Sequence, residues 1–331
     1  MGKVTIKDVA KEAGVSISTV SNALNGVDVL KPETREHILE VAKRLYYMPN
    51  LNGRNLKSKK TKVIGLFVTS LKGPYFVILA DSIFRECMKK GYELNVFVTW
   101  DNDSAMNNIL GQRVDGCIIL GTAGQEQNIK KIQDYGVPAV FLDREQADKR
   151  ISSIIFDSYQ AGVTAAEYLI SRRAKRIGFI QGYRDNYDAE LRYKGFADGL
   201  RKADIVLETE YIWEGCFEKE TARESVKNFL NKGIPVPDAI FAANDLSAIG
   251  AMEALLEEGI KIPQDTIILG VDGIEQNQWI KPTLSSIETG FERQGSMAVC
   301  ELLELIEGKK SGEIRKIQGT LVERESTVKQ P

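Results

Sequence analysis

From Lys62 onward, short apolar runs alternate with stretches of helical periodicity. The runs are VIGLFV, LNVFV, GCIIL, PAVFL, SSIIF, RIGFI, DAIFA and TIILGV. Runs of this length and content predict buried parallel strands that are joined by helices. The segment from Lys62 to the end is longer than one hydrophobic core usually supports, and its pattern divides near residues 157–161. We therefore predict an α/β body of two doubly wound parallel-sheet lobes.

The first 48 residues have a different pattern, which predicts three short helices. Apolar residues at helical spacing in the first two helices are Val9, Ala10, Ala13, Val20, Ala23 and Leu24. Gly14 suits the positive φ of a tight turn between these helices, and Ser16 is a good N-cap for the second. The third helix is predicted over residues 32–46, with inward positions at Ile38, Leu39, Val41, Ala42 and Leu45. This all-α head has the layout of a helix-turn-helix.

The charge of the chain is unevenly distributed. Residues 1–62 contain twelve Lys and Arg against six Asp and Glu, whereas the remaining residues contain 32 against 40. A phosphate backbone would attract the basic head and not the acidic body. The second helix also leaves a mostly polar face outward, which consists of Ile17, Ser18, Thr19, Ser21 and Asn22. We therefore expect double-stranded DNA to be the partner of the head.

The stretch TIKDVAKEAGVSISTVSNALN (residues 5–25) is similar to the lactose/galactose repressor family of bacterial transcription regulators, and the similarity extends over essentially the whole chain. It implies a DNA-binding domain at 1–48, a hinge helix and linker at 49–61, and a periplasmic-binding-protein-like effector-binding and dimerisation body at 62–331. The first lobe would comprise about 62–160 and 290–320, and the second about 161–289 and 321–331.

The resemblance also implies which residues contact DNA. Ile17, Ser18 and Asn22 occupy the base-reading positions of a helix that enters the major groove, and the Asn22 amide suits adenine. Many relatives carry Arg at the Asn22 position. The residues expected to contact the DNA backbone are Thr5, Ser16, Thr19, Ser21 and Asn25. The hinge residues expected at the minor groove are Asn50, Arg54, Leu56 and Lys57, with Leu56 as the wedge between base pairs.

Polar residues that follow predicted strands indicate a ligand site, because ligands of open parallel sheets bind beyond the carboxyl ends of the strands. The candidate effector-binding residues, including aromatic rings for stacking, are Tyr75, Phe76, Asp143, Arg144, Arg192, Asn244, Asp245, Asp272 and Trp279. Carboxylates, amides and rings together suit a sugar or sugar derivative. Because the guanidinium groups of Arg144 and Arg192 could pair with a carboxylate, an acidic sugar is also a candidate ligand. The alternative is that individual acids and amides only cap the next helix.

The amphipathic stretch from Pro74 to Lys90 is a candidate dimer surface on the first lobe. Its apolar residues are Val77, Ile78, Ala80, Ile83 and Phe84. The alternative use of this stretch is ordinary packing on the sheet, and opposite faces can serve both uses. A homodimer would place two heads on a two-fold symmetric operator. Because the chain ends at LVERESTVKQP without a heptad tail, we expect dimers only.

Several function classes find no support in the sequence. The single histidine, His37, lies in the head, and the four cysteines include no CxxC pair. No phosphate loop or GxGxxG turn is present, so we expect no cofactor, no metal and no enzymatic activity. The sequence has no signal-peptide core and no membrane-length apolar run, which favours a cytoplasmic location. The alternatives are a secreted solute-binding protein and a glycoside-processing enzyme, neither of which needs a basic head.

Overall fold

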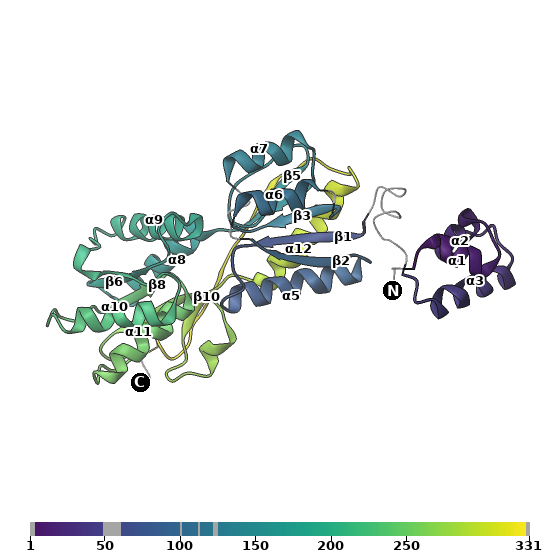
Figure 1. Ribbon diagram of the computed structural model, residues 1–331. Helices are drawn as coiled ribbons and strands as arrows, with labels where there is room; N and C mark the ends of the chain where they lie inside the picture. The colour runs from purple at the N-terminus through teal and green to yellow at the C-terminus, as the bar shows by residue number, and fades with distance from the viewer. Residues whose placement is uncertain (1–3, 49–60, 100, 112, 122–124, 329–331) are drawn as a thin grey trace. The chain divides into compact units, whose positions relative to one another are not determined.

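The computed structural model describes residues 4–48, 61–99, 101–111, 113–121 and 125–328. The chain divides into two compact units, residues 1–61 and 62–331 (Figure 1). The expected hinge residues Asn50, Arg54, Leu56 and Lys57 lie outside the described residues. Within the described part of the chain, no helix is both long enough and apolar enough to cross a membrane.

The first unit is a bundle of three helices, α1 (Ile6–Ala13), α2 (Ile17–Leu24) and α3 (Pro32–Arg44). A capping box starts α1, because the Thr5 N–H donates to the Asp8 carboxylate at 2.8 Å. Gly14 ends this helix with a φ of 67°, the left-handed conformation that the tight turn was predicted to need. The Ser16 hydroxyl caps α2 by accepting the Thr19 N–H at 3.1 Å.

The core of the head is formed by one apolar stripe from each helix. Its buried residues are Val9, Ala10, Ala13, Val20, Ala23, Ile38, Val41 and Ala42. The prediction that Leu39 points inward is wrong, since 43% of its surface is exposed. Ile38, Val41, Ala42 and the half-buried Leu45 already fill the i, i+3, i+4, i+7 stripe of α3, and Leu39 lies about 100° away from Ile38 around that helix.

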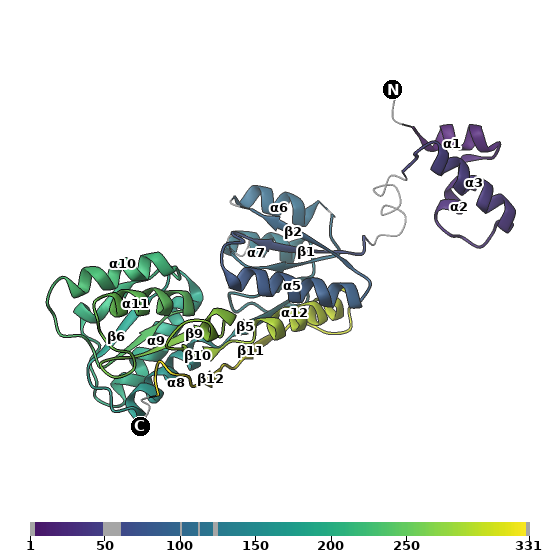
Figure 2. The ribbon, with the colours of Figure 1, turned by 90° about the horizontal axis from the view of Figure 1, so that it is seen from below.

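The first lobe of the body contains a six-stranded parallel sheet in the order β11-β5-β4-β3-β1-β2. The strands are β1 (Val63–Val68), β2 (Glu93–Val98), β3 (Gly116–Ile119), β4 (Ala139–Phe141), β5 (Ile151–Phe156) and β11 (Ile314–Ile317). The helices are α5 (Pro74–Lys89), α6 (Asn102–Leu110), α7 (Glu126–Asp134) and α12 (Phe291–Ile306). Separate cores lie on the two faces of the sheet, one beneath α5 and α12 and the other beneath α6 and α7 (Figures 1 and 2).

The second lobe repeats this layout with the sheet order β12-β10-β9-β8-β6-β7. The strands are β6 (Ile177–Gln181), β7 (Ile212–Glu214), β8 (Ala239–Ala242), β9 (Ile267–Asp272), β10 (Ser285–Glu288) and β12 (Thr320–Val322). The helices are α8 (Ser158–Ser171), α9 (Tyr187–Arg201), α10 (Lys219–Leu230) and α11 (Asp245–Glu257), with short 3-10 helices η2 (Thr209–Tyr211) and η3 (Glu275–Gln278). Helices α8 and α9 cover one core, and α10 and α11 cover the other.

The prediction of two doubly wound lobes is confirmed, with one addition at an edge. Strand β12 pairs antiparallel with β10, whereas the other strand pairs of the two sheets are parallel. The chain crosses between the lobes three times: after β5 at Asp157, after β10 at Thr289 and Gly290, and after β11 at Gln318 and Gly319. The cleft between the lobes therefore has three connecting segments at its base.

Candidate functional site

In the first unit, α2 presents the residues that were expected to read DNA. Ile17 and Ser18 are exposed and Asn22 is half-buried, so all three can be reached from outside. The Ser16 hydroxyl is within hydrogen-bond distance of the hydroxyls of Ser18 and Thr19, at 2.7 and 2.8 Å. The Asn25 amide donates to the Ser21 hydroxyl at 3.2 Å. These contacts hold the polar face of α2 in a fixed arrangement before any partner binds.

In the second unit, a cavity of about 620 Å³ lies between the lobes. Its walls are the segments that follow the carboxyl ends of the parallel strands, as expected for sheets of this topology. Of the sequence-predicted effector residues, the structure brings together Tyr75, Phe76, Asp143, Arg192, Asn244 and Asp272 on these walls. The first three come from lobe one and the last three from lobe two.

Arg192 is the central cation of the cavity. Only 4% of its surface is exposed, and its guanidinium carbon lies 5.8 Å from the Phe156 ring centre and 6.0 Å from that of Phe217. Its guanidinium donates to the Ala243 carbonyl and, at 3.2 Å, to the Ser158 hydroxyl. It lies within the second turn of α9.

Two partly buried carboxyls, those of Asp188 and Asp272, are stabilised by the charge of this cation. Burial raises the pKa of Asp188, and the Ser158 hydroxyl, which donates to it at 2.7 Å, and the charge of Arg192 oppose that rise. Burial raises the pKa of Asp272 well above its ordinary value, the charge of Asp245 adds to the rise, and Arg192 again opposes it. The cavity floor thus holds more acidic than basic groups and favours a ligand that donates hydrogen bonds.

The third carboxylate, that of Asp143, is already paired within the protein. It accepts the Gly121 N–H at 2.7 Å and two hydrogen bonds from Arg144, at 2.9 and 3.0 Å. Arg144 also donates to the Gly121 carbonyl at 3.1 Å and does not line the cavity. Its role in this structure is to orient Asp143, and the cavity contains one of the two arginines that the sequence suggested.

Two other expected effector residues lie away from the cavity. Asp245 is fully buried at the start of α11 and accepts hydrogen bonds from Gly273, Ile274, Asn277 and Ser286. It therefore holds the loop after β9. Trp279 ends η3 with 66% of its surface exposed to solvent. Neither side chain is on the cavity wall.

Sequence reasoning missed several residues of the cavity wall. They include Lys72, Phe156, Asn186, Asp188, Phe217, Glu218, Thr289, Phe291 and Gln294. A signal was available for Asp188, which lies four residues before Arg192 and so on the same face of α9. No local pattern marks Thr289 or Phe291, which reach the cavity because the chain crosses between the lobes there. The neighbouring Tyr187 does not line the cavity, and its hydroxyl donates to Glu145 at 3.0 Å.

The aromatic wall of the cavity is preassembled. The Tyr75 ring packs edge-on against that of Phe291, with centroids 4.5 Å apart, and lies 5.2 Å from that of Phe76. Burial raises the pKa of Tyr75 well above its ordinary value, so its hydroxyl stays protonated and can donate a hydrogen bond. Fixed rings beside carboxylates provide both the apolar and the polar surfaces that a sugar requires.

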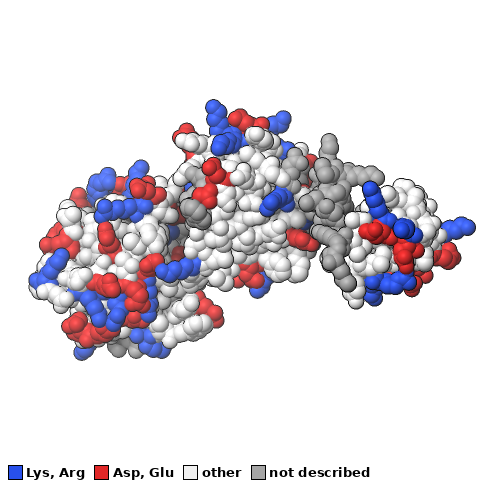
Figure 3. All heavy atoms as spheres, viewed as in Figure 1, with Lys and Arg blue, Asp and Glu red and all other residues white. Residues whose placement is uncertain are grey.

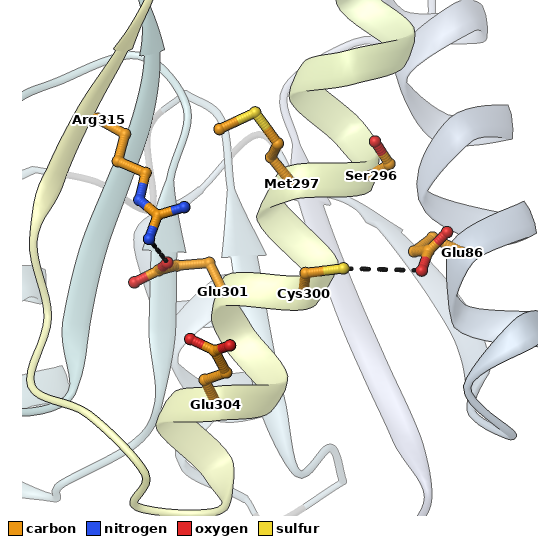
Figure 4. A pocket seen from close by; sticks show the side chains of 7 residues that line it. All are labelled: Glu86, Ser296, Met297, Cys300, Glu301, Glu304 and Arg315. Atoms are coloured by element: carbon orange, nitrogen blue, oxygen red, sulfur yellow. Dashed lines mark hydrogen bonds and ion pairs between the residues drawn. The ribbon is translucent and has the colours of Figure 1, made fainter.

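A second, smaller hollow of about 220 Å³ lies where α5, α12 and β11 meet (Figure 4). The Cys300 thiol points to the Glu86 carboxylate at 3.6 Å, and the Arg315 guanidinium lies 3.8 Å from Glu301. Burial and the charge of Glu86 raise the pKa of Cys300, which keeps it a thiol. Because these polar groups pair with one another, the larger cavity is the better candidate for a ligand site.

Lobe one also exposes an apolar surface, which we call the α5–β2 face. It consists of Val77, Phe84 and Met88 on α5 with Val96 and Val98 on β2. Val77 and Met88 are 61% and 60% exposed. In Figure 3, the part of lobe one where Figure 1 shows α5 carries few charged side chains. Contiguous exposed apolar surfaces commonly mark interaction sites, which makes the α5–β2 face a candidate for one.

Comparison with known proteins identifies the architecture. The profile of the bacterial regulatory proteins of the lacI family matches residues 5–50, and that of periplasmic binding proteins and the sugar-binding domain of the LacI family matches residues 61–325. The chain belongs to the LacI family. This confirms the resemblance seen in the sequence. The HTH-type transcriptional repressor PurR of Photorhabdus laumondii is 35% identical over 99% of this chain and 98% of its own length.

Other LacI-family members give the same result. PurR of Pasteurella multocida is 33% identical over 92% of each chain. The crystal structure of the lac repressor dimer bound to operator and the anti-inducer ONPF matches with a TM-score of 0.83 at 29% identity. The match covers 99% of this chain and all of that one. These relatives are transcriptional repressors.

Proposed function

We propose that this chain is a transcriptional repressor that binds a two-fold symmetric operator as a homodimer and whose DNA affinity is set by a small ligand in the interlobe cavity. One observation carries the proposal: a helix-turn-helix that exposes Ile17, Ser18 and Asn22 belongs to the same chain as a two-lobed body with a preassembled cavity. The repressors named above support it. A repressor with this role would act in the cytoplasm.

The proposed DNA contacts follow the geometry of α2. Ile17, Ser18 and Asn22 would meet base edges, while the hydroxyls and amides around them would contact the sugar–phosphate backbone. The hydrogen bonds among Ser16, Ser18 and Thr19 support this division, because they fix the helix start that would face a phosphate. The hinge residues would add minor-groove contacts.

The α5–β2 face is the proposed dimer surface. Its residues, exposed in the single chain, would be buried against the same face of a second copy, as closed two-fold symmetry requires. The opposite side of α5 packs Leu79 and Ile83 into the core of lobe one, so both uses of the amphipathic helix are compatible. Two paired heads would then read two half-sites.

The proposed ligand is neutral and rich in hydroxyl groups. Asp188 and Asp272 can accept further hydrogen bonds, and the rings of Tyr75, Phe76 and Phe291 offer apolar faces to a sugar ring. The acidic sugar left open by the sequence fits less well, since Arg144 is committed to Asp143 and Arg192 is already bonded to the Ala243 carbonyl and Ser158. The carboxylates of Asp188 and Asp272 beside Arg192 would also repel the carboxylate of an acidic sugar.

Control of DNA binding would operate through lobe orientation. Residues from both lobes line the cavity, so a ligand that contacts both favours the orientation in which these contacts are made. A change in orientation in a dimer alters the spacing of the two hinges and hence the cost of placing both heads on one operator. By linkage, DNA must change ligand affinity by the same factor.

The function is tested by two experiments on the full chain. In vitro selection from random duplex DNA should enrich an inverted repeat, and residues 62–331 alone should enrich nothing. A thermal-shift panel with D-glucose, D-ribose, D-glucuronate and nucleobases should raise the melting temperature with neutral polyols more than with the uronate. Enrichment of sequences without symmetry, or stabilisation by the uronate alone, would contradict the proposal.

A further inference from the structure

The loop after β9 connects the cavity to a lobe crossing. Asp272, the last residue of β9, lines the cavity with a φ of 131°, and Gly273 follows with a φ of 80°. A non-glycine residue in this region is strained and persists only where its surroundings hold it. The backbone around Asp272 is therefore fixed by contacts on both sides.

On one side, Asp245 holds the residues that follow. Its buried carboxylate accepts the Gly273 N–H at 2.7 Å and the Ile274 N–H at 3.1 Å, as well as the Ser286 hydroxyl at 2.7 Å. Gly273 also passes so close to Glu288 that a Cβ at this glycine would lie 2.5 Å from the Glu288 Cγ. The loop after Asp272 consequently has little freedom to absorb movement.

On the other side, Thr289 holds the Asp272 carbonyl. The Thr289 N–H donates to this oxygen at 3.2 Å and the Thr289 hydroxyl donates to it at 3.1 Å. Thr289 is 3% exposed and also lines the cavity. It follows β10 of lobe two and precedes α12 of lobe one, so it lies within a crossing between the lobes.

We propose that Thr289 is a positioning residue that couples the cavity to lobe orientation, through the hydrogen bond from its hydroxyl to the Asp272 carbonyl. A ligand that binds the Asp272 carboxylate acts on a peptide that cannot relax toward the loop, because Asp245 fixes the loop. The displacement passes to Thr289. A rotation of the lobes moves the crossing at Thr289, so the length of this hydrogen bond depends on the orientation of the lobes.

Thr289 makes two hydrogen bonds to the Asp272 carbonyl, one from its main-chain N–H and one from its hydroxyl, and substitution can separate them. The Thr289 N–H belongs to the β9–β10 pairing, in which Asp272 is opposite Glu288, and it persists whatever the side chain. The Thr289 hydroxyl makes an additional hydrogen bond, which depends on the position of the crossing between the lobes. Thr289→Val removes the hydroxyl with little change in shape, whereas Thr289→Ser retains it. These two variants isolate the one interaction.

Hydrogen–deuterium exchange of the ligand-free full chain tests the inference. In Thr289→Val, amides at the other two crossings, residues 156–160 and 317–320, should exchange about three- to tenfold faster, the range for loss of one buried neutral hydrogen bond. The core strand β8 should exchange as in the unchanged protein. Thr289→Ser should match the unchanged protein throughout, and Thr289→Ala should repeat the Val result.

Three outcomes overturn the inference. They are unchanged exchange at 156–160 and 317–320 in Thr289→Val, equally fast exchange in Thr289→Ser, and an equal acceleration in β8, which would show general destabilisation. The inference rests on the lobe movement of the proposed function and not on DNA binding. Failure of the DNA selection would therefore leave this result unaffected, and the two failures can be told apart.

Discussion

The Lys72 ammonium donates a 2.8 Å hydrogen bond to the Glu218 carboxylate, and the bond joins the two lobes across the cleft. Lys72 follows β1 in lobe one, and Glu218 caps α10 in lobe two. The Tyr183 hydroxyl donates to the same oxygen at 3.1 Å. Lys72 and Tyr183 lower the pKa of Glu218 through these bonds. The ion pair between Lys72 and Glu218, which we call the clasp, thus joins the two lobes at the entrance of the cavity.

This clasp predicts a modest, salt-dependent effect on ligand affinity. Lys72→Glu should weaken binding of a cavity ligand by about 0.5 kcal/mol, the usual value for an exposed ion pair. Calorimetry should show the difference at low salt and lose it at about 1 M salt, where exposed charges are screened. Lys89→Glu, on α5 outside the cavity wall, is the matched control and should have no effect.

The charge-swapped pair Lys72→Glu with Glu218→Lys should regain most of the lost affinity. Acid should break the clasp in the unchanged protein. Because the pKa of Glu218 is lowered, its contribution is present above the ordinary Glu pKa and is lost as pH falls through the lowered value. A swapped pair that binds no better than Lys72→Glu alone would contradict this interpretation.

Asp272→Asn should make the protein more stable and less able to bind. Burial raises the pKa of Asp272, so the folded state binds protons more tightly than the unfolded state. Stability is therefore lost as pH rises from the ordinary Asp pKa through this raised value. Removing the charge should raise the free energy of unfolding at neutral pH by about 1 kcal/mol, seen as a higher midpoint in urea. A lower midpoint would contradict the assignment.

Ligand affinity should decline on acidification. A hydroxyl-rich ligand donates to the ionised forms of Asp188 and Asp272, whose pKa values are both raised. Binding is therefore complete above these raised values and weakens as pH falls through them, earlier than ordinary carboxyls would titrate. A calorimetric pH series should show this, with Asp272→Asn flattening the profile. Affinity that rises on acidification would contradict the carboxylate contacts.

Asn22→Ala should relax the operator sequence at one position in each half-site. A bidentate contact to a base contributes about 1–3 kcal/mol of discrimination. Competition binding with operators altered at each position should locate the loss at a single symmetric pair. Ser21→Ala, on the same helix and bonded to Asn25, should weaken all sequences alike. If Asn22→Ala instead weakened binding to all operator sequences equally, Asn22 would not be a base-reading residue.

Val77→Asp should produce monomers. The substitution places a charge on the α5–β2 face, where the second copy would bury it without a partner. Sedimentation should show a monomer at concentrations where the unchanged chain is dimeric. Val206→Asp, at an exposed position of lobe two, is the control and should leave the dimer intact. A dimeric Val77→Asp would place the interface elsewhere.

The strands that the sequence predicted are those with continuous apolar runs. All eight runs became strands; seven are buried on both faces, as VIGLFV in β1 shows, whereas LNVFV became the partly exposed edge strand β2. Strands β7 and β11 were missed because they lie at sheet edges, where polar residues such as Arg315 and Lys316 are tolerated. The prediction for Leu39 was wrong because a short helix can carry more apolar residues than the neighbouring helices can cover.

Local sequence pattern predicted cavity residues where a polar side chain lies at a strand end. Asp143, Asn244 and Asp272 lie at or just after strand ends and reach the cavity, whereas Tyr75, Phe76 and Arg192 lie in helices. Asp245 has the same local setting, but its carboxylate points to the Gly273 loop, a direction that tertiary packing decides. Thr289 reaches the cavity only because β10 leads across to the other lobe. Such residues require the crossings, which periodicity does not reveal.

The most direct test is a titration of full-length protein on its selected operator, with and without the polyol that gives the largest thermal shift. We expect the ligand to change operator affinity by about fivefold or more, and operator DNA to change ligand affinity by the same factor. A ligand that binds the cavity and leaves operator affinity unchanged would contradict the central claim that the cavity governs the head.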